Sequence, residues 1–120
     1  MRRVLLVIVL IALSGCGSGQ PKMAGGKWAE ALHSPDAKIR KRAAFTLGNI
    51  GWSDPVVLPA LMEALKDADA GVRCEAILAL LKYGPGAREA LTKLEEMRRQ
   101  DRNAQVRQYA AKAVEKLRSE

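Results

Sequence analysis

Apolar side chains recur along most of the chain at spacings of three and four residues, the period of an amphipathic helix. The pattern is clearest in three similar stretches, residues 36–40, 69–73 and 103–107, each of which ends in an aliphatic residue followed by arginine. These arginines, Arg40, Arg73 and Arg107, stand 33 and 34 residues apart. A repeat of this length with helical sequence in every unit predicts a solenoid of stacked helix pairs, an all-α fold.

The similarity continues beyond the arginines. At four, five, eight and eleven residues after the aliphatic residue, each unit carries apolar or aromatic side chains, and three of these offsets share one helix face. The positions are Ala43, Ala44, Leu47 and Ile50, then Ala76, Ile77, Leu80 and Tyr83, then Ala110, Ala111, Val114 and Leu117. Each unit therefore ends in an amphipathic helix that buries the same side.

These residues resemble the HEAT repeat, particularly the short bacterial form associated with phycobilisome lyase subunits. The resemblance covers residues 27–118 and includes Gly51 and Gly84. It implies an α-solenoid of about three helix pairs, in which the second helices line a concave surface that binds other proteins. It also implies a structural ladder in which each arginine pairs with the capping acid of a neighbouring repeat; direct ligand binding by the arginines is the alternative. The ladder residues are Asp36, Arg40, Asp69, Arg73, Asn103 and Arg107.

Six helices are expected in the repeat domain, residues 27–120. The first covers residues 27–33 and ends before Pro35, because a residue that precedes proline avoids helical dihedral angles. Helices over residues 37–50 and 70–83 each follow an aspartate N-cap and stop at a glycine. Pro55 begins the helix between them. Residues 87–99 form the fifth helix, and Asn103 caps the sixth.

The first sixteen residues have the features of an export signal. Arg2 and Arg3 precede an apolar run over residues 4–12, far shorter than the roughly 20 residues that a membrane-spanning helix needs. Residues 13–16, Leu-Ser-Gly-Cys, look like a bacterial lipobox, which implies cleavage before Cys16 and attachment of lipid to that residue. An ordinary signal peptide or an uncleaved anchor is the alternative. The expected division is a signal peptide over residues 1–15, lipidated Cys16 with a flexible tether to residue 26, and the repeat domain.

A lipid anchor would place the protein at the bacterial cell envelope, bound to a membrane. In bacteria with two membranes, aspartate directly after the lipidated cysteine is associated with retention in the inner membrane. Gly17 and Ser18 stand there instead and resemble the outer-membrane default.

Composition supports helices and limits the chemistry. Apolar residues make up 48% of the chain and aromatic residues 4%, which favours an alanine- and leucine-rich helical interior. The net charge is +7, and removal of Arg2 and Arg3 leaves 18 basic against 13 acidic residues. Such an excess suits either a solvated surface or attraction to anionic partners. The export signal argues against nucleic acid as a partner.

Candidates for catalysis or metal binding are few. His33 is the only histidine, and Cys74 is the one thiol left if Cys16 carries lipid. Cys74 has no nearby base in the sequence and is interpreted as a small, partly exposed residue rather than a reactive thiol. No set of histidines and cysteines has the spacing of metal ligands. We therefore expect no enzymatic activity, no metal and no cofactor.

The candidate binding site lies on the exposed side of the second helix in each pair. Phe45 and Leu78 would form an apolar patch ringed by basic residues; the alternative is that they pack against each other between repeats. Trp28 and Trp52 are interpreted as packing residues. The candidate concave surface comprises Lys41, Arg42, Phe45, Asn49, Glu75, Leu78, Lys82, Tyr109, Lys112 and Lys116.

Three functions fit these observations. A membrane-anchored scaffold or adaptor that binds another protein is favoured, and recognition of an anionic envelope component by the basic surface is the alternative. Chromophore handling is carried only by the family resemblance, and the export signal argues against it. Because three repeats are about the minimum for a stable stack, a partner or a second copy could complete its ends.

Overall fold

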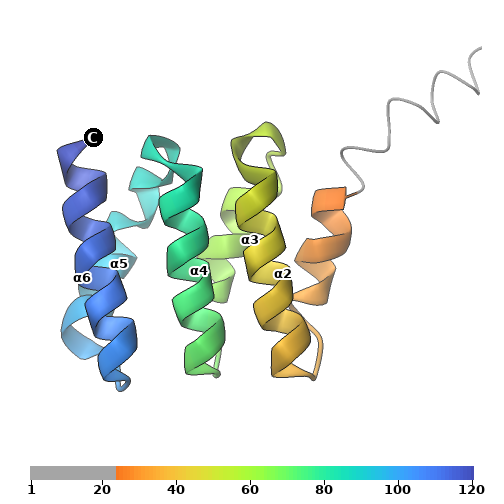
Figure 1. Cartoon of the computed structure of the whole chain (residues 1–120), viewed down its shortest axis with the longest axis horizontal. Helices are drawn as coiled ribbons and strands as arrows, with labels where there is room; N and C mark the ends of the chain where they lie inside the picture. Colours follow the sequence, from red (N-terminus) through yellow and green to blue (C-terminus); the bar gives the residue numbers. More distant parts are fainter. Residues whose placement is uncertain (1–23) are drawn as a thin grey trace, which may run out of the picture.

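A computed structural model describes residues 24–120. Within this range the chain forms helices and connecting turns without strands, and it stacks three helix pairs side by side (Figure 1). The first pair is the helix over residues 24–31 with α2 (Ala37–Ile50), and the second is α3 (Val57–Ala64) with α4 (Ala70–Tyr83). The third is α5 (Leu91–Gln100) with α6 (Ala104–Ser119). The predicted all-α solenoid is confirmed.

The second helices begin where the sequence places a capping side chain. Asp36 accepts a hydrogen bond from the Lys38 amide, and Asp69 accepts one from the Val72 amide. Asn103 caps α6 in the same way. These side chains satisfy amides that have no partner inside the helix. The caps explain why the observed bounds of α2 and α4 match the predicted ones.

Glycine ends α2 and α4. Gly51 has φ +67° and Gly84 has φ +88°, values that a side chain with a Cβ atom rarely adopts. The Gly51 amide donates to the Leu47 carbonyl, and the Gly84 amide donates to the Leu80 carbonyl. Both helices therefore stop at the predicted residue.

The first helix of each pair departs further from the expected bounds. Residues 24–26, assigned to the tether, are helical, and the described part of this helix covers residues 24–31, whereas residues 27–33 were predicted. Pro55 lies in a turn after a 3-10 turn over Gly51–Ser53, and α3 begins at Val57. In the third pair a 3-10 segment over Pro85–Ala90 precedes α5. These starts lack the aspartate or asparagine cap that fixes the second helices.

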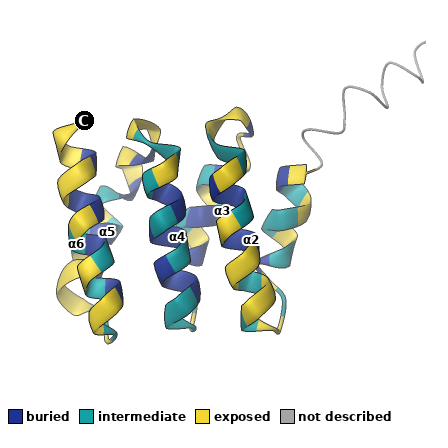
Figure 2. Ribbon diagram, viewed as in Figure 1, coloured by how far each residue is buried: buried dark blue, intermediate teal, exposed yellow. Residues whose placement is uncertain are grey.

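The helices form two layers with the core between them. Helices α2, α4 and α6 lie side by side in one layer, and the first helix, α3 and α5 lie behind it (Figure 1). Figure 2 shows buried residues where the second helices face one another and the other layer. Of the nine repeated positions predicted to share the buried face, seven are buried, and Ile50 and Tyr83 are half-buried.

Small residues bring α2 and α4 close together. Ala43 and Ala76 are fully buried. A Cβ atom on Gly48 would lie 2.7 Å from the Ala79 Cβ and 2.9 Å from its Cα, so only glycine fits at this crossing. The close approach sets the spacing of the surface that these helices present on their outer side.

Candidate functional site on the second helices

The outward-facing side chains of α2, α4 and α6 define what we call the second-helix surface. It is defined by the ten candidate residues Lys41, Arg42, Phe45, Asn49, Glu75, Leu78, Lys82, Tyr109, Lys112 and Lys116. None of the ten is buried: seven are exposed, and Glu75, Leu78 and Tyr109 are half-buried. Helical period and capping therefore place all ten on accessible faces.

Phe45 is the central apolar feature of this surface. Its side chain is 47% exposed although it is aromatic. The Lys82 ammonium lies 4.4 Å from the centre of the Phe45 ring, and it also donates to Asn49 Oδ1 at 3.2 Å. The cation–π contact and the hydrogen bond join α2 to α4 and hold the Phe45 ring beside a fixed positive charge.

A shallow hollow of about 320 Å³ lies beside Phe45. The structure brings four candidates together here, Lys41, Arg42, Phe45 and Glu75, with Lys38 as a fifth lining residue that the sequence did not suggest. Lys38 stands one helical turn before Arg42, so helical spacing alone could have identified it. The hollow combines one apolar wall with three basic groups and one acid.

The remaining candidates lie away from the hollow. Leu78 is half-buried and is not among the side chains that pack on the core. Tyr109 does pack on the core, and its hydroxyl accepts a hydrogen bond from Gln105 Nε2 at 3.4 Å. Lys112 and Lys116 belong to α6 and do not line the hollow. The second-helix surface thus has two parts: the hollow beside Phe45 on α2 and α4, and a basic region on α6.

The repeated arginines form ion pairs, but not with the capping residues. Arg40 Nε lies 2.9 Å from Asp67 Oδ2, and Arg73 Nε lies 3.0 Å from Asp101 Oδ2. Both pairs are bidentate, with second contacts of 3.2 Å and 3.0 Å from Nη2. The prediction that the arginines pair with Asp69 and Asn103 is wrong, because those side chains are engaged by amides of their own helices.

Each arginine also fixes the loop that precedes its helix. Nη1 of Arg40, Arg73 and Arg107 donates to the carbonyl six residues earlier, at 2.8, 2.8 and 2.6 Å. Those carbonyls belong to Ser34, Asp67 and Asp101, which share the 33- and 34-residue spacing of the arginines. This second repeated position was the signal that could have identified the acids.

The repeated arginines are engaged by partners within the fold. Arg73 is only 9% exposed. Its Nε atom donates to the Asp101 carboxylate, and its Nη1 atom donates to carbonyls of the preceding loop. Burial alone would raise the pKa of Asp101, but the hydrogen bonds from Arg73 and the Asn103 amide outweigh it and hold that pKa below its usual value. Arg107 has loop carbonyls as partners and no carboxylate among the described residues.

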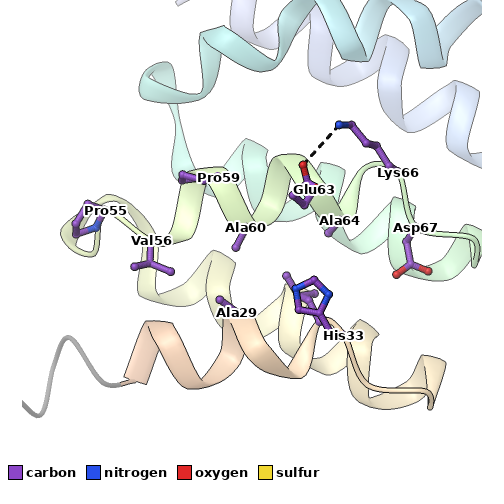
Figure 3. Close-up of a pocket in the computed structure, with 11 residues that line it drawn as sticks. Ala29, His33, Pro55, Val56, Pro59, Ala60, Glu63, Ala64, Lys66 and Asp67 are labelled. Atoms are coloured by element: carbon purple, nitrogen blue, oxygen red, sulfur yellow. Dashed lines mark ion pairs between the residues drawn. The ribbon is translucent and has the colours of Figure 1, made fainter.

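A groove that the sequence did not suggest runs between the first helix and α3 (Figure 3). It has a volume of about 630 Å³, and Ala29 faces Ala60 across it. Alanine, valine and proline side chains dominate its lining, with His33, Glu63, Lys66 and Asp67 toward one end. Small residues on both helices leave this space open, a consequence of packing that periodicity does not reveal.

The two tryptophans differ. Trp28 is half-buried and packs against the core, whereas Trp52 is 77% exposed. The interpretation of Trp52 as a packing residue is therefore wrong. Trp52 lies in the 3-10 turn between α2 and α3, where no neighbouring helix covers it.

The remaining chemistry is sparse within residues 24–120. Cys74 is buried, not partly exposed as expected, and burial raises the pKa of its thiol, which disfavours the reactive thiolate. No group of three potential metal ligands occurs in the described range. No helix in this range is long and apolar enough to cross a membrane. The expected signal peptide, Cys16 and most of the tether lie outside the described residues.

Comparison with known proteins identifies a family. Residues 27–115 match the family described as HEAT repeats, which covers most of the chain and all three helix pairs. A search of curated proteins finds no match.

Proposed function

The chain belongs to the HEAT-repeat family, and on that premise we propose that it is a membrane-anchored scaffold that binds another protein through the second-helix surface. HEAT repeats generally serve as scaffolds for protein interactions, and the family is typically non-catalytic. The finer parts of this proposal are the partner's chemistry, the binding site and the anchor.

The main support for this binding site is the exposed Phe45 ring, which lies beside a preformed hollow. An aromatic side chain that remains 47% exposed in the middle of a surface is a good anchor point for a partner. Lys82 holds the ring in place, so little side-chain entropy is lost when the hollow is filled. The hollow suits an apolar side chain of the partner.

The charges around the hollow favour a partner with acidic residues near its apolar anchor. Lys38, Lys41 and Arg42 contribute three positive charges, and Glu75 contributes one negative charge. Such an arrangement speeds association with an acidic partner and discriminates against basic ones. We therefore propose a protein segment with an apolar side chain flanked by aspartate or glutamate.

The same three basic groups support a second candidate, recognition of an anionic envelope component. The two candidates differ in salt dependence. Binding that rests on exposed charges weakens strongly as ionic strength rises, whereas binding that rests on burial of Phe45 does not.

Membrane anchoring is proposed through lipid on Cys16. It is supported by the basic residues Arg2 and Arg3, the short apolar run and the Leu-Ser-Gly-Cys sequence. Several acyl chains on one residue would give stable attachment. The proposed location is the cell envelope, with the outer membrane favoured where two membranes exist.

The binding site is tested by placing a photo-crosslinking phenylalanine analogue at position 45 in cells. The matched control carries the analogue at Ile39, which is on the same helix and 45% exposed but does not line the hollow. We expect one protein adduct from position 45 that the Arg42→Glu variant reduces and the control lacks. Equal adduct patterns at both positions would overturn the assignment of this site.

The anchor is tested by intact mass and membrane fractionation of the chain made in a bacterial host. We expect a lipid mass increment on a chain that begins at Cys16, and its loss in Cys16→Ala. A soluble, unmodified, full-length chain would reject the anchor and reopen cytoplasmic partners.

A further inference from the structure

One edge of the solenoid gathers the ends of the second helices. Helices α2, α4 and α6 all end there, and the described chain also begins there, at residue 24 (Figure 1). The two 3-10 segments, Gly51–Ser53 and Pro85–Ala90, follow α2 and α4 at the same edge. We call this the Trp52 edge, defined by residues 24–28, 49–56, 82–90 and 116–120.

Exposed apolar side chains stand on the Trp52 edge without a partner in the fold. Trp52 is 77% exposed, the most exposed of the large apolar residues in the described chain, and Val56 is 40% exposed. Leaving an indole in water forgoes the stabilisation that burying its ring would give. Neither side chain contributes to the core, so packing within the domain does not explain why these two positions are apolar.

The start of the described chain lies against the same turn. Asp54, two residues after Trp52, is 5% exposed and packs on Gly25 so closely that a Cβ atom there would lie 2.1 Å from Asp54 Oδ2. Asp54 Oδ1 also accepts from the Val56 amide at 3.0 Å. The Trp52 turn is thereby fixed beside the point where the chain arrives from its N-terminus.

The length of chain between Cys16 and this edge is short. Ala24, the first described residue, stands eight positions after Cys16. Eight residues span at most about 28 Å even when fully extended, and typically nearer 16 Å as a flexible coil. A lipid on Cys16 would therefore hold the Trp52 edge within reach of the bilayer, although the tether alone would not decide which edge faces the membrane.

Basic residues accompany the indole on this edge. Lys27, Lys82, Arg88 and Lys116 are all exposed there. Arg118 is exposed there too, and the acids on the edge are the exposed Glu89 and Glu120 and the buried Asp54, so five basic residues face three acidic ones. Amphipathic indoles and lysines are the side chains that settle at the boundary between lipid headgroups and acyl chains.

We infer that the Trp52 edge rests on the membrane surface, with the Trp52 indole in the interfacial layer; this rests on the proposed lipid anchor at Cys16. The contact fixes an orientation that a flexible tether alone would not. Because α2, α4 and α6 end at this edge, their C-terminal ends point toward the bilayer. The hollow beside Phe45 then faces sideways, open to a partner in the same compartment.

The test uses the full lipidated chain in vesicles of phosphatidylethanolamine and phosphatidylglycerol whose acyl chains carry bromine, which quenches tryptophan fluorescence at short range. Trp28→Phe leaves Trp52 as the only indole. The matched control combines Trp28→Phe and Trp52→Phe with Ile39→Trp, which puts the only indole at an exposed position near the start of α2, away from the Trp52 edge. Flotation of the vesicles in a density gradient reports anchoring separately. Far-ultraviolet circular dichroism checks that both variants fold.

We expect Trp52 emission to fall severalfold more than the emission of the control indole at position 39 on transfer from plain to brominated vesicles. Equal and weak quenching of both indoles, with the chain still floating with the vesicles, would overturn the membrane contact and leave the anchor intact. A chain that does not float would overturn the anchor and the contact with it.

Discussion

The ion pair between Arg73 and Asp101 joins the second and third repeats, and a double-mutant cycle can measure what it contributes. Arg73→Met keeps much of the side-chain volume, and Asp101→Asn keeps an oxygen for the Asn103 amide, which bonds to Asp101 Oδ1 at 2.9 Å. The two variants and their combination isolate the energy of the charge pair from the packing and from the loop hydrogen bond.

The expected magnitude follows from burial and geometry. The side chains of Arg73 and Asp101 are 11% and 8% exposed, and the pair has two contacts of 3.0 Å. Loss of one partner from a buried pair costs about 3 to 5 kcal/mol, whereas exposed pairs contribute about 1 kcal/mol or less. Since both side chains retain slight exposure, we expect a coupling energy of about 2 kcal/mol.

Urea unfolding followed by circular dichroism measures the coupling. With a slope of about 2 kcal/mol per molar urea, a coupling of about 2 kcal/mol places the midpoint of the double variant about 1 M above the value expected from adding the two single shifts. Solenoid stability is a sum over repeats and their interfaces, so hydrogen exchange in α6 should accelerate before exchange in α2. The exposed Lys66–Glu63 pair, at 3.5 Å, provides the control cycle.

A coupling for Arg73 and Asp101 no larger than that of the exposed control would refute the reasoning. It would mean that the ladder costs as much in desolvation as it gains, and that apolar packing alone holds the repeats together. Arg107→Met offers a further check. Because Arg107 has no carboxylate partner among the described residues, its replacement should cost less than that of Arg73.

Three further predictions concern other parts of the fold. Gly25→Ala should destabilise the chain, because the added Cβ atom would clash with Asp54 Oδ2. The adjacent Gly26 has open space around it, so Gly26→Ala should stabilise the chain by about 0.5 to 1 kcal/mol. Thermal unfolding measures both changes, and shifts of the same sign would contradict the prediction. Because the pKa of Asp101 is lowered in the folded state, the folded chain binds fewer protons than the unfolded chain. The stabilisation that Asp101 contributes is therefore fully present above the ordinary pKa of 3.8 and is lost as the pH falls through the lower pKa of the folded state. Urea midpoints between pH 5 and pH 2 should show this loss, and Asp101→Asn should reduce it; an unchanged slope in the variant would argue against the assignment. Cys74, in a Cys16→Ala background, should react with iodoacetamide far more slowly than a free thiol until urea exposes it, because burial raises its pKa and blocks access; equal rates before and after unfolding would show that it is accessible.

The parts of the fold that could be predicted are those controlled by nearby residues. An aspartate or asparagine cap acts on amides two or three positions away, so the starts of α2, α4 and α6 could be read from the sequence. Helices α3 and α5 lack such caps, and their predicted starts at residues 55 and 87 differ from the structure by two and four residues. Helical period likewise placed Phe45 and Lys82 on the outer side of the stack, because a face is a local property of a helix.

The repeat period, the helix faces and the all-α class were determined by the sequence itself, because each depends on spacing within one helical unit. Contacts between units were decided only by the tertiary structure. The arginines pair with Asp67 and Asp101, 27 and 28 residues away, because Asp69 and Asn103 are already bonded to their own helices. The Lys82 contact on Phe45, the groove against α3 and the exposure of Trp52 also depend on how neighbouring helices are spaced, which the Gly48 crossing and the alanine contacts determine.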